Sequence, residues 1–306
     1  MKNLLPCSLF ASSLLLAACR DCPDVSHERL ENSLYAIADS VPGMVGIAFV
    51  SDLDTVTVNN GVAYPMMSVF KLHQALAAGS AVERAGASLD SVLSVRADEL
   101  DPHTWSPMLK VYGNGDFDVS VGELIRYAVT SSDNNASNLL FSHISSPADT
   151  YRFVKSVAAD TSFQILYSEA EMKREHSLSY LNYTSPLSAA LLIRQVFTSD
   201  IIGSATQDSI RSALLTVTTG HDRLGAAVAD AQGVLFGHKT GSGYRNDAGE
   251  LVAHNDVGYF RLPDGRDYAL AVFIRDFRGT EDEASAVIAD ISKLVYDRFL
   301  SEDSRY

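Results

Sequence analysis

The chain has 306 residues, of which 46% are hydrophobic and 20% charged, so it can bury a sizeable core without disulfides or structural metals. Its net charge of −14 argues against nucleic-acid binding, because contact with phosphates needs a basic surface. No run of about 18 apolar residues occurs, so the sequence predicts no ordinary transmembrane helix.

The N-terminal segment has the pattern of a signal peptide over residues 1–18, with Lys2 near the start and an apolar run to Ala18. The run ends in Leu16-Ala17-Ala18-Cys19, which resembles a lipobox, where a lipoprotein signal peptidase cuts before a cysteine that then carries lipid. This pattern predicts an exported, periplasmic protein with a tether over residues 19–25 and a membrane attachment through a lipid on Cys19. Ordinary cleavage that leaves free thiols at Cys19 and Cys22 is the alternative.

A helix and two strands are predicted next. Residues 26–41 carry apolar side chains at helical spacing, whereas residues 45–50 and 55–58 predict two strands joined by a hairpin turn. From Ser68 to about Gly220 the patterns are mostly helical, and Ser120-x-x-Glu123 is a capping box that opens one of these helices.

The C-terminal part returns to strands and ends in a helix. The predicted strands cover residues 236–240, 252–262 and 268–277. The last of them is apolar at nearly every position, which is typical of a central strand covered on both faces. Thr280-x-x-Glu283 then opens a final amphipathic helix.

These elements predict an α/β fold of the α+β type. An antiparallel sheet flanked by helices is built from both chain ends, residues 26–64 and 219–306, and an all-α lobe covers residues 65–218. A cleft between two such lobes is the usual place for a site. Residues 157–184 are polar and fit no element. Within them we expect an omega-type loop over about 160–184, because long structureless loops in compact domains are usually functional or disordered.

Ser68-Val69-Phe70-Lys71 is the only Ser-x-x-Lys in the chain. Three residues apart on a helix, the serine oxygen and the lysine amine lie within reach of each other. A serine hydroxyl becomes a good nucleophile once a base takes its proton, and a lysine can be that base if burial lowers its pKa. Alone the motif is weak, since a chain of this length contains about one by chance.

Two further triplets strengthen this interpretation. Ser132-Asp133-Asn134 follows a predicted helix and Lys239-Thr240-Gly241 ends a predicted strand, and each has a chance expectation below roughly 0.1. Together, in this order, the three motifs resemble those of class A serine β-lactamases and penicillin-binding proteins. The resemblance covers residues 26–300. Three further segments, Asn182-Tyr-Thr-Ser-Pro186, Thr218-Thr219-Gly220 and His238-Lys-Thr-Gly-Ser242, resemble the PER-like and CfxA-like subgroup of class A.

The resemblance implies a β-lactamase/transpeptidase-like fold, which agrees with the predicted elements, and a role for each motif residue. Ser68 would attack the lactam carbonyl, Lys71 would help to remove and relay its proton, and Ser132 would pass a proton to the leaving nitrogen. The backbone N–H groups of Ser68 and Ser242 would form the oxyanion hole.

The resemblance also implies how the substrate is bound. Asn134 would hold its side-chain carbonyl, and Lys239, with Arg223 as a second cation, would bind its carboxylate. The implied binding set is Trp105, Asn134, Arg223, Lys239, Thr240, Gly241 and Ser242. Simpler interpretations stay open: a core aromatic for Trp105, a surface ion pair for Arg223, and an Asx turn for Asn134 and its neighbour Asp133, which we exclude from the site.

Turnover of the ester needs a second base aimed at a water. In class A enzymes this is a glutamate in the pattern Glu-x-x-Leu-Asn, and here Glu169-Ala-Glu-Met-Lys173 resembles it, with lysine in place of the asparagine. Glu169 is therefore the implied base, with Glu171 and Glu175 as rivals and three solvated loop acids as the simplest alternative. Asn138 resembles the amide that braces this loop from the helical lobe.

The implied function is hydrolysis of the amide bond of β-lactam antibiotics through a serine acyl-enzyme, which would confer resistance. The histidines show no metal-binding spacing and no phosphate loop occurs, so no cofactor is expected, and the protein is expected to be a monomer. A penicillin-binding DD-peptidase, or a lipid-anchored β-lactam sensor that is acylated without turnover, would share the three motifs. The glutamate loop favours the hydrolase.

Overall fold

The computed structural model describes residues 25–301, so the signal peptide and Cys19 lie outside the described residues. Its α-helices are α1 (Val25–Ser40), α2 (Phe70–Arg84), α3 (Leu109–Tyr112), α4 (Val121–Thr130), α5 (Asn134–His143), α6 (Pro147–Val157), α7 (Glu169–Arg174), α8 (Pro186–Thr198), α9 (Ser204–Leu215) and α10 (Glu281–Ser301). Its strands are β1 (Met44–Ser51), β2 (Thr55–Val58), β3 (Tyr64–Pro65), β4 (Val92–Val95), β5 (Phe117–Ser120), β6 (Phe163–Gln164), β7 (Tyr183–Thr184), β8 (Leu235–Ser242), β9 (Leu251–Arg261) and β10 (Asp267–Phe277). Within the described residues no helix is long and apolar enough to span a bilayer.

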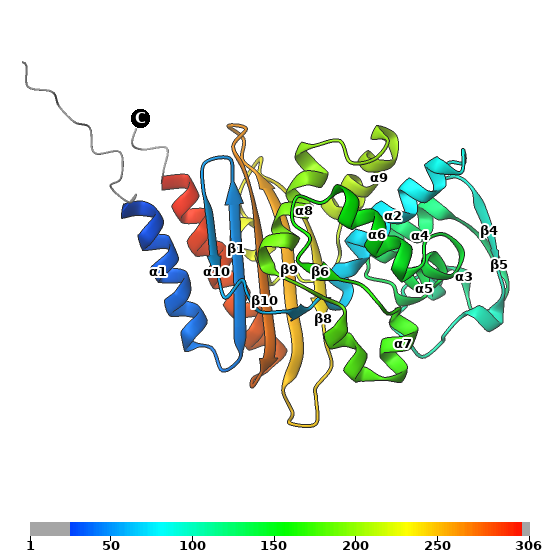
Figure 1. Ribbon diagram of the computed structural model, residues 1–306, viewed down its shortest axis with the longest axis horizontal. Helices are drawn as coiled ribbons and strands as arrows, with labels where there is room; N and C mark the ends of the chain where they lie inside the picture. Colours follow the sequence, from blue (N-terminus) through cyan, green and yellow to red (C-terminus); the bar gives the residue numbers. More distant parts are fainter. Residues whose placement is uncertain (1–24, 302–306) are drawn as a thin grey trace, which may run out of the picture.

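The main sheet joins the two ends of the chain, as the sequence predicted. It has five antiparallel strands in the order β2-β1-β10-β9-β8, and β1 pairs with β10 along its whole length. β10 therefore has neighbours on both sides, and residues 268–274 are buried, which confirms the predicted central strand. Figure 1 shows α1 and α10 on one side of this sheet and the helical lobe on the other.

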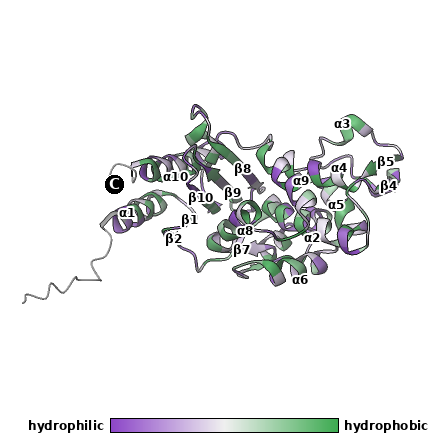
Figure 2. Cartoon of the chain, turned by 90° about the horizontal axis from the view of Figure 1, so that it is seen from above, coloured by the Kyte–Doolittle hydropathy of each residue, from purple (hydrophilic) through white to green (hydrophobic). Residues whose placement is uncertain are grey.

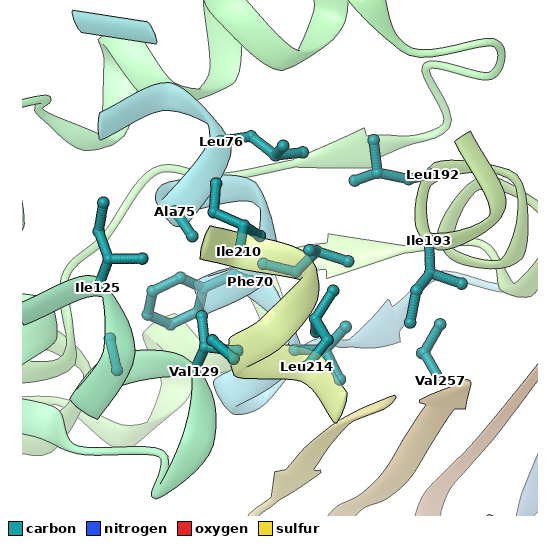
Figure 3. Close-up of a cluster of buried hydrophobic side chains, with 14 of the residues drawn as sticks. Phe70, Ala75, Leu76, Ile125, Val129, Leu192, Ile193, Ile210, Leu214 and Val257 are labelled. Atoms are coloured by element: carbon teal, nitrogen blue, oxygen red, sulfur yellow. The ribbon is translucent and has the colours of Figure 1, made fainter. Parts of the chain in front are cut away.

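Two hydrophobic clusters hold the layers together. One lies between the sheet and the helices α1 and α10, where the last helix contributes Ile288, Ile291 and Val295. The other joins the opposite face of the sheet to the helical lobe, which extends away from α1 and α10 when seen from above (Figure 2). In Figure 3, Phe70 and Leu76 lie in this second cluster, which also contains Val257 of β9. Helix α2 is thus packed on nearly all sides, and the residues at its start have little freedom.

The capping boxes expected from the sequence are present. At the start of α4, the side chains of Ser120 and Glu123 each accept a hydrogen bond from the backbone N–H of the other residue. Thr280 and Glu283 do the same before α10. Ser185 caps α8, which has Pro186 at its first position. These bonds satisfy N–H groups that have no partner within the helix, which is why such short patterns predict helix starts well.

The expectation that residues 157–184 form no element was wrong. The segment contains β6, α7, a 3-10 helix (His176–Leu181) and β7, and β7 lies between β3 and β6 in a small sheet. Asn182 fastens the segment from inside, because its Oδ1 accepts hydrogen bonds from the backbone of Leu166 and Tyr167. The loop is therefore an ordered structure, and its helix α7 begins with Glu169. The exact limits of the two predicted lobes stay a prediction.

Candidate active site

The Ser-x-x-Lys motif lies where a 3-10 helix (Met67–Val69) runs into α2. Lys71 Nζ donates to Ser68 Oγ at 2.9 Å, so the expected contact across one helical turn is present. The Lys71 side chain is fully buried and also donates to Ser132 O at 2.9 Å and to Asn134 Oδ1 at 2.6 Å. One amine thus links the first motif with the second.

Glu169 reaches the same serine from the other side. Its Oε1 accepts a hydrogen bond from Ser68 Oγ at 3.2 Å and lies 2.9 Å from Lys71 Nζ. The carboxylate is mostly shielded from water, and the buried ion pair holds it in place. Of the three acids considered for this segment, Glu169 is the one that contacts Ser68.

The other two acids have structural contacts. Glu171 completes a capping box at the start of α7, where its Oε2 accepts from Ser168 N at 2.8 Å and from Ser168 Oγ at 2.7 Å. Glu175 is exposed and accepts from Ser177 Oγ at 2.9 Å. Lys173 pairs with Asp101 on the rim.

Asn138 braces α7 from the helical lobe. Its Oδ1 accepts a hydrogen bond from Ala170 N at 3.1 Å, one residue after Glu169. Because an unpaired N–H at the start of a helix needs an acceptor, this contact also fixes how α7 lies against α5.

Ser132 occupies a strained position between two cationic side chains. Its φ is +58°, an uncommon value for a residue other than glycine and one that often marks a functional site. Its backbone oxygen accepts from Lys71, while its Oγ accepts from Lys239 Nζ at 2.9 Å. Asp133 caps α5 and accepts hydrogen bonds from Ala136 N and Met108 N, in keeping with its exclusion from the site.

Asn134 and Trp105 lie at the open side of the cleft. Asn134 Nδ2 donates to Thr104 Oγ1 at 2.9 Å, while its Oδ1 accepts from Lys71, so both ends of the amide are held. Trp105 is 58% exposed and its Nε1 donates to Ser131 O, which rules out the core interpretation. A pocket of about 130 Å³ here is lined by Met67, Thr104, Asn134, Glu169, Met172, Lys173, His176, Ser179 and Tyr244.

The third motif forms the opposite wall at the end of β8. Lys239 is fully buried, and burial together with the charge of Lys71 holds its pKa well below the usual range. A Cβ at Gly241 would lie 2.4 Å from Met66 O, so only glycine lets β8 approach the segment that carries Ser68. This approach brings β8, which ends at Ser242, into contact with the 3-10 helix of Ser68. Thr240 Oγ1 is 2.6 Å from Thr219 Oγ1.

Arg223 lies behind the end of β8 and is buried, so the surface ion pair considered for it is not what the structure contains. Its guanidinium donates to Ser242 Oγ at 2.7 Å and to Asn255 O at 2.8 Å. Burial lowers its pKa. The end of β8 therefore has two buried cations, which is an arrangement suited to binding a carboxylate.

Two sets of residues near the site were missed as site residues. His176 and Tyr244 stack with their ring centroids 4.0 Å apart in the pocket wall, and nothing in the pattern of an irregular loop indicated this. The buried pair of His238 on β8 and Asp256 on β9 links these two strands, whereas the sequence indicated His238 only as a mark of the subgroup. The only available signal for this pair was a charged residue, Asp256, in the middle of a predicted strand.

Comparison with known proteins agrees with this geometry. The chain matches the beta-lactamase enzyme family over residues 29–299. It is 47% identical over 268 residues to a β-lactamase of Phocaeicola vulgatus, covering 87% of this chain and 84% of that relative. It is 30% identical over 270 residues to the extended-spectrum β-lactamase PER-1 of Pseudomonas aeruginosa, covering 87% of this chain and 86% of that relative. The crystal structure of a class A β-lactamase from Bacteroides cellulosilyticus superimposes with a TM-score of 0.85 at 28% identity, covering 91% of this chain and 100% of the other. The chain therefore belongs to the beta-lactamase enzyme family, as a serine β-lactamase of class A.

Proposed function

We propose that this β-lactamase hydrolyses penicillins and cephalosporins in two steps, through an ester at Ser68 that is then attacked by water. The position of Ser68 Oγ carries the proposal, because it lies 2.9 Å from Lys71 Nζ and 3.2 Å from Glu169 Oε1. One nucleophile thus adjoins an amine and a carboxylate that can pass a proton between them over 2.9 Å.

In the first step, Ser68 Oγ attacks the lactam carbonyl carbon while its proton passes to the Lys71–Glu169 pair. The carbonyl oxygen becomes an anion, which the backbone N–H groups of Ser68 and Ser242 would stabilise. When the intermediate collapses, the C–N bond breaks and the nitrogen takes a proton from Ser132 Oγ. Lys239 Nζ donates to Ser132 Oγ and can restore that proton, whereas Lys71 contacts the backbone oxygen of Ser132. The proton that the Lys71–Glu169 pair gained from Ser68 balances the one that Lys239 gives, and exchange with water then restores both groups.

In the second step, Glu169 takes a proton from a water as this water attacks the ester carbonyl. The C–O bond to Ser68 breaks, and the oxygen of Ser68 regains a proton from the same pair. General base catalysis of this kind contributes about 10²- to 10⁴-fold. Without it the ester persists and the enzyme is inhibited.

The carboxylate of the substrate is proposed to bind at the end of β8, to Lys239, Thr240, Ser242 and Arg223. The protein as a whole carries a net charge of −14, so it repels anions at long range. Two buried cations at this one place supply the local attraction that an anionic substrate needs. On the opposite wall, Asn134 would hold the side-chain carbonyl.

Hydrolysis of a chromogenic cephalosporin by the protein without residues 1–22 tests the proposal. We expect Ser68→Ala to lower kcat by at least about 10³-fold, because only binding and the oxyanion hole remain. Ser209→Ala, an exposed serine on α9, is the matched control and should leave the rate unchanged. Near-normal turnover by Ser68→Ala would remove the assignment, and a persistent adduct on the unmutated protein would favour the peptidase or the sensor.

We also propose that the protein is exported to the periplasm and attached to a membrane through a lipid on Cys19. The support is the apolar segment that ends in Leu16-Ala17-Ala18-Cys19. A tether over residues 19–25 would leave the cleft free, since the described chain begins with α1, on the side of the sheet away from the helical lobe (Figure 1).

A further inference from the structure

A buried acid lies on β9, the strand next to the one that carries the third motif. Asp256 on β9 is opposite Thr240 on β8, and its side chain has no exposure to solvent. Its Oδ1 lies 2.9 Å from Nδ1 of His238, which is also buried, and its Oδ2 accepts from Leu224 N at 3.2 Å. The mechanism above uses neither Asp256 nor His238.

A carboxylate is taken out of water at a high free-energy cost unless nearby charges compensate it. The hydrogen-bond partners of Asp256 are an imidazole nitrogen and a backbone N–H, neither of which is a fixed cation. The compensating charges must therefore act from the next layer. Two buried cations are there: Lys239 on β8 and Arg223, which is bonded to the backbone of Asn255, the neighbour of Asp256.

The charges around the cleft form a nearly balanced set. Three buried side chains, Lys71, Lys239 and Arg223, are basic, and Lys71 is paired directly with Glu169. The buried acid next to Ser132, Asp133, is compensated by hydrogen bonds from Ser106, Met108 and Ala136 at the start of α5. That leaves Lys239 and Arg223 with Asp256, which is paired with Thr240, the neighbour of Lys239, and bonded to Leu224 N, the neighbour of Arg223. Arg223 also faces Asp222 and Glu281, but these two carboxylates are exposed, and water screens their charges. One positive charge then remains, and a single substrate carboxylate would neutralise it.

We propose that Asp256 is a positioning residue of the substrate-carboxylate site: held by His238 and Leu224 N, it supplies the buried counter-charge that keeps Lys239 and Arg223 together as cations at the end of β8. It never touches the substrate. This inference rests on the proposed function, because it assumes that an anionic substrate binds to these cations.

The groups around Lys239 determine the direction of the effect. Burial lowers the pKa of Lys239, and the cations Lys71 and Arg223 lower it further, whereas the carboxylates of Asp256 and Glu169 raise it. Asp256 also raises the pKa of Arg223 against the effect of burial. With the charge of Asp256 removed, Lys239 loses its proton at a lower pH, and the substrate carboxylate then loses a cationic partner.

The test is the pH dependence of kcat and KM for one cephalosporin between about pH 6 and pH 9.5, with Asp256→Asn as the variant. Asparagine has the same shape and can still bond to Leu224 N. We expect the alkaline limb of the kcat/KM profile to shift to lower pH by about one pH unit. At a fixed pH on that limb this is a loss of about tenfold in kcat/KM, mainly through a higher KM. Near pH 6, kcat/KM should stay within about threefold of the unmutated enzyme.

Asp222→Asn is the matched control, because it removes the same charge from the exposed neighbour of Arg223, and it should leave the limb in place. A merely structural role for Asp256 would lower activity equally at every pH. An alkaline limb that does not move in a folded Asp256→Asn protein overturns the inference. The proposed function fails separately, if the unmutated enzyme does not turn over the cephalosporin at neutral pH.

If Asp256→Asn does not fold, a second variant decides. Arg223→Gln removes one of the two cations that Asp256 balances, so the double variant Asp256→Asn/Arg223→Gln should regain a cooperative thermal transition. Such coupling between two neighbouring changes is what a double-mutant cycle measures. A double variant that remains unfolded would also overturn the inference, because relief of the excess positive charge would then not be what Asp256 provides.

Discussion

The three acids of the omega-type loop offer a sharp test, because their contacts differ although they lie within seven residues of each other. Glu169 contacts Ser68 and Lys71, Glu171 accepts two hydrogen bonds from Ser168 as part of a capping box, and Glu175 is exposed. Replacing each by alanine should therefore produce three different results.

Glu169→Ala removes the base for the attacking water, which is worth about 10²- to 10⁴-fold in the deacylation step. The ester at Ser68 should then accumulate. Glu171→Ala instead removes a helix cap, at about 1 kcal/mol of the free energy of unfolding. For a chain of this size this lowers Tm by about 2 °C. Turnover should stay within a few-fold of normal, and Glu175→Ala should change neither quantity.

Intact-protein mass spectrometry after mixing each variant with a cephalosporin detects the covalent adduct directly. Thermal unfolding measures the loss of Tm that follows removal of the capping box. Glu171→Gln is a control that keeps the capping box, so it should restore Tm. If Glu171→Ala traps the adduct while Glu169→Ala turns over normally, the assignment of the base is wrong. If none of the three traps it, the loop does not supply the base, and Lys173 becomes the first residue to examine.

Three further predictions concern the wall, the strand and the anchor. Tyr244→Ala removes the ring stacked on His176 and the hydroxyl bonded to the His176 carbonyl oxygen. It should raise kcat/KM several-fold for cephalosporins with bulky side chains relative to small penicillins, whereas Tyr244→Phe should not. An unchanged ratio of the two kcat/KM values would contradict a role of Tyr244 as a wall of the substrate pocket. Gly241→Ala should lower kcat by more than about tenfold in a folded protein, because its Cβ would meet Met66 O at 2.4 Å and push β8 away from Ser68; normal kinetics would refute this. Cys19→Ser should release the protein from membranes with activity per molecule unchanged, and a wholly soluble unmutated protein would instead favour ordinary cleavage.

The elements that could be predicted from the sequence are those determined by neighbouring residues. Hairpin turns, capping boxes and apolar periodicity act over a few positions, so the strands β1 and β10 and the starts of α4 and α10 were predicted within a residue or two. The Ser-x-x-Lys contact was predictable for the same reason, since one helical turn determines the distance. The start of α7 was missed although its signal, Ser168-x-x-Glu171, is the same capping box. A six-residue helix in a polar segment has no apolar stripe to support that signal.

Contacts between distant segments could not be predicted in this way. Asp256 and His238 are 18 positions apart, and a charged residue in a strand gives no indication of which buried group will face it. Arg223 is a similar case, because exposed and buried arginines look alike in a sequence. The motifs identified the groups that the structure brings together around Ser68, while the charges that support those groups depend on how β8, β9 and α10 pack.

Two buried histidines show how this packing also determines stability against acid. His73 on α2 is fully enclosed beside Phe163, with ring centroids 5.0 Å apart, and burial lowers its pKa to about 4. His254 on β9 is also buried, and burial with the charge of Arg223 lowers its pKa to about 3. Both are therefore neutral in the folded protein at pH 5, whereas a histidine in the unfolded chain, with a pKa of about 6.5, is then charged.

The sign of the effect follows from these values. A histidine whose pKa is depressed by folding contributes its stability above the unfolded value, and this contribution is lost as the pH falls from about 6.5 towards the folded pKa of about 4 for His73. Between pH 7 and pH 5, His73 alone should lower the free energy of unfolding by about 2 kcal/mol. His73→Phe keeps an aromatic ring against Phe163 and cannot take a proton. The free energy of unfolding of this variant, measured with urea, should therefore fall by about 2 kcal/mol less than that of the unmutated protein over the same pH interval. The quantity compared is the change in the free energy of unfolding between pH 7 and pH 5, which is insensitive to any constant effect of the larger ring. Equal losses in the two proteins would mean that His73 is already protonated in the fold and that its burial does not oppose the charge.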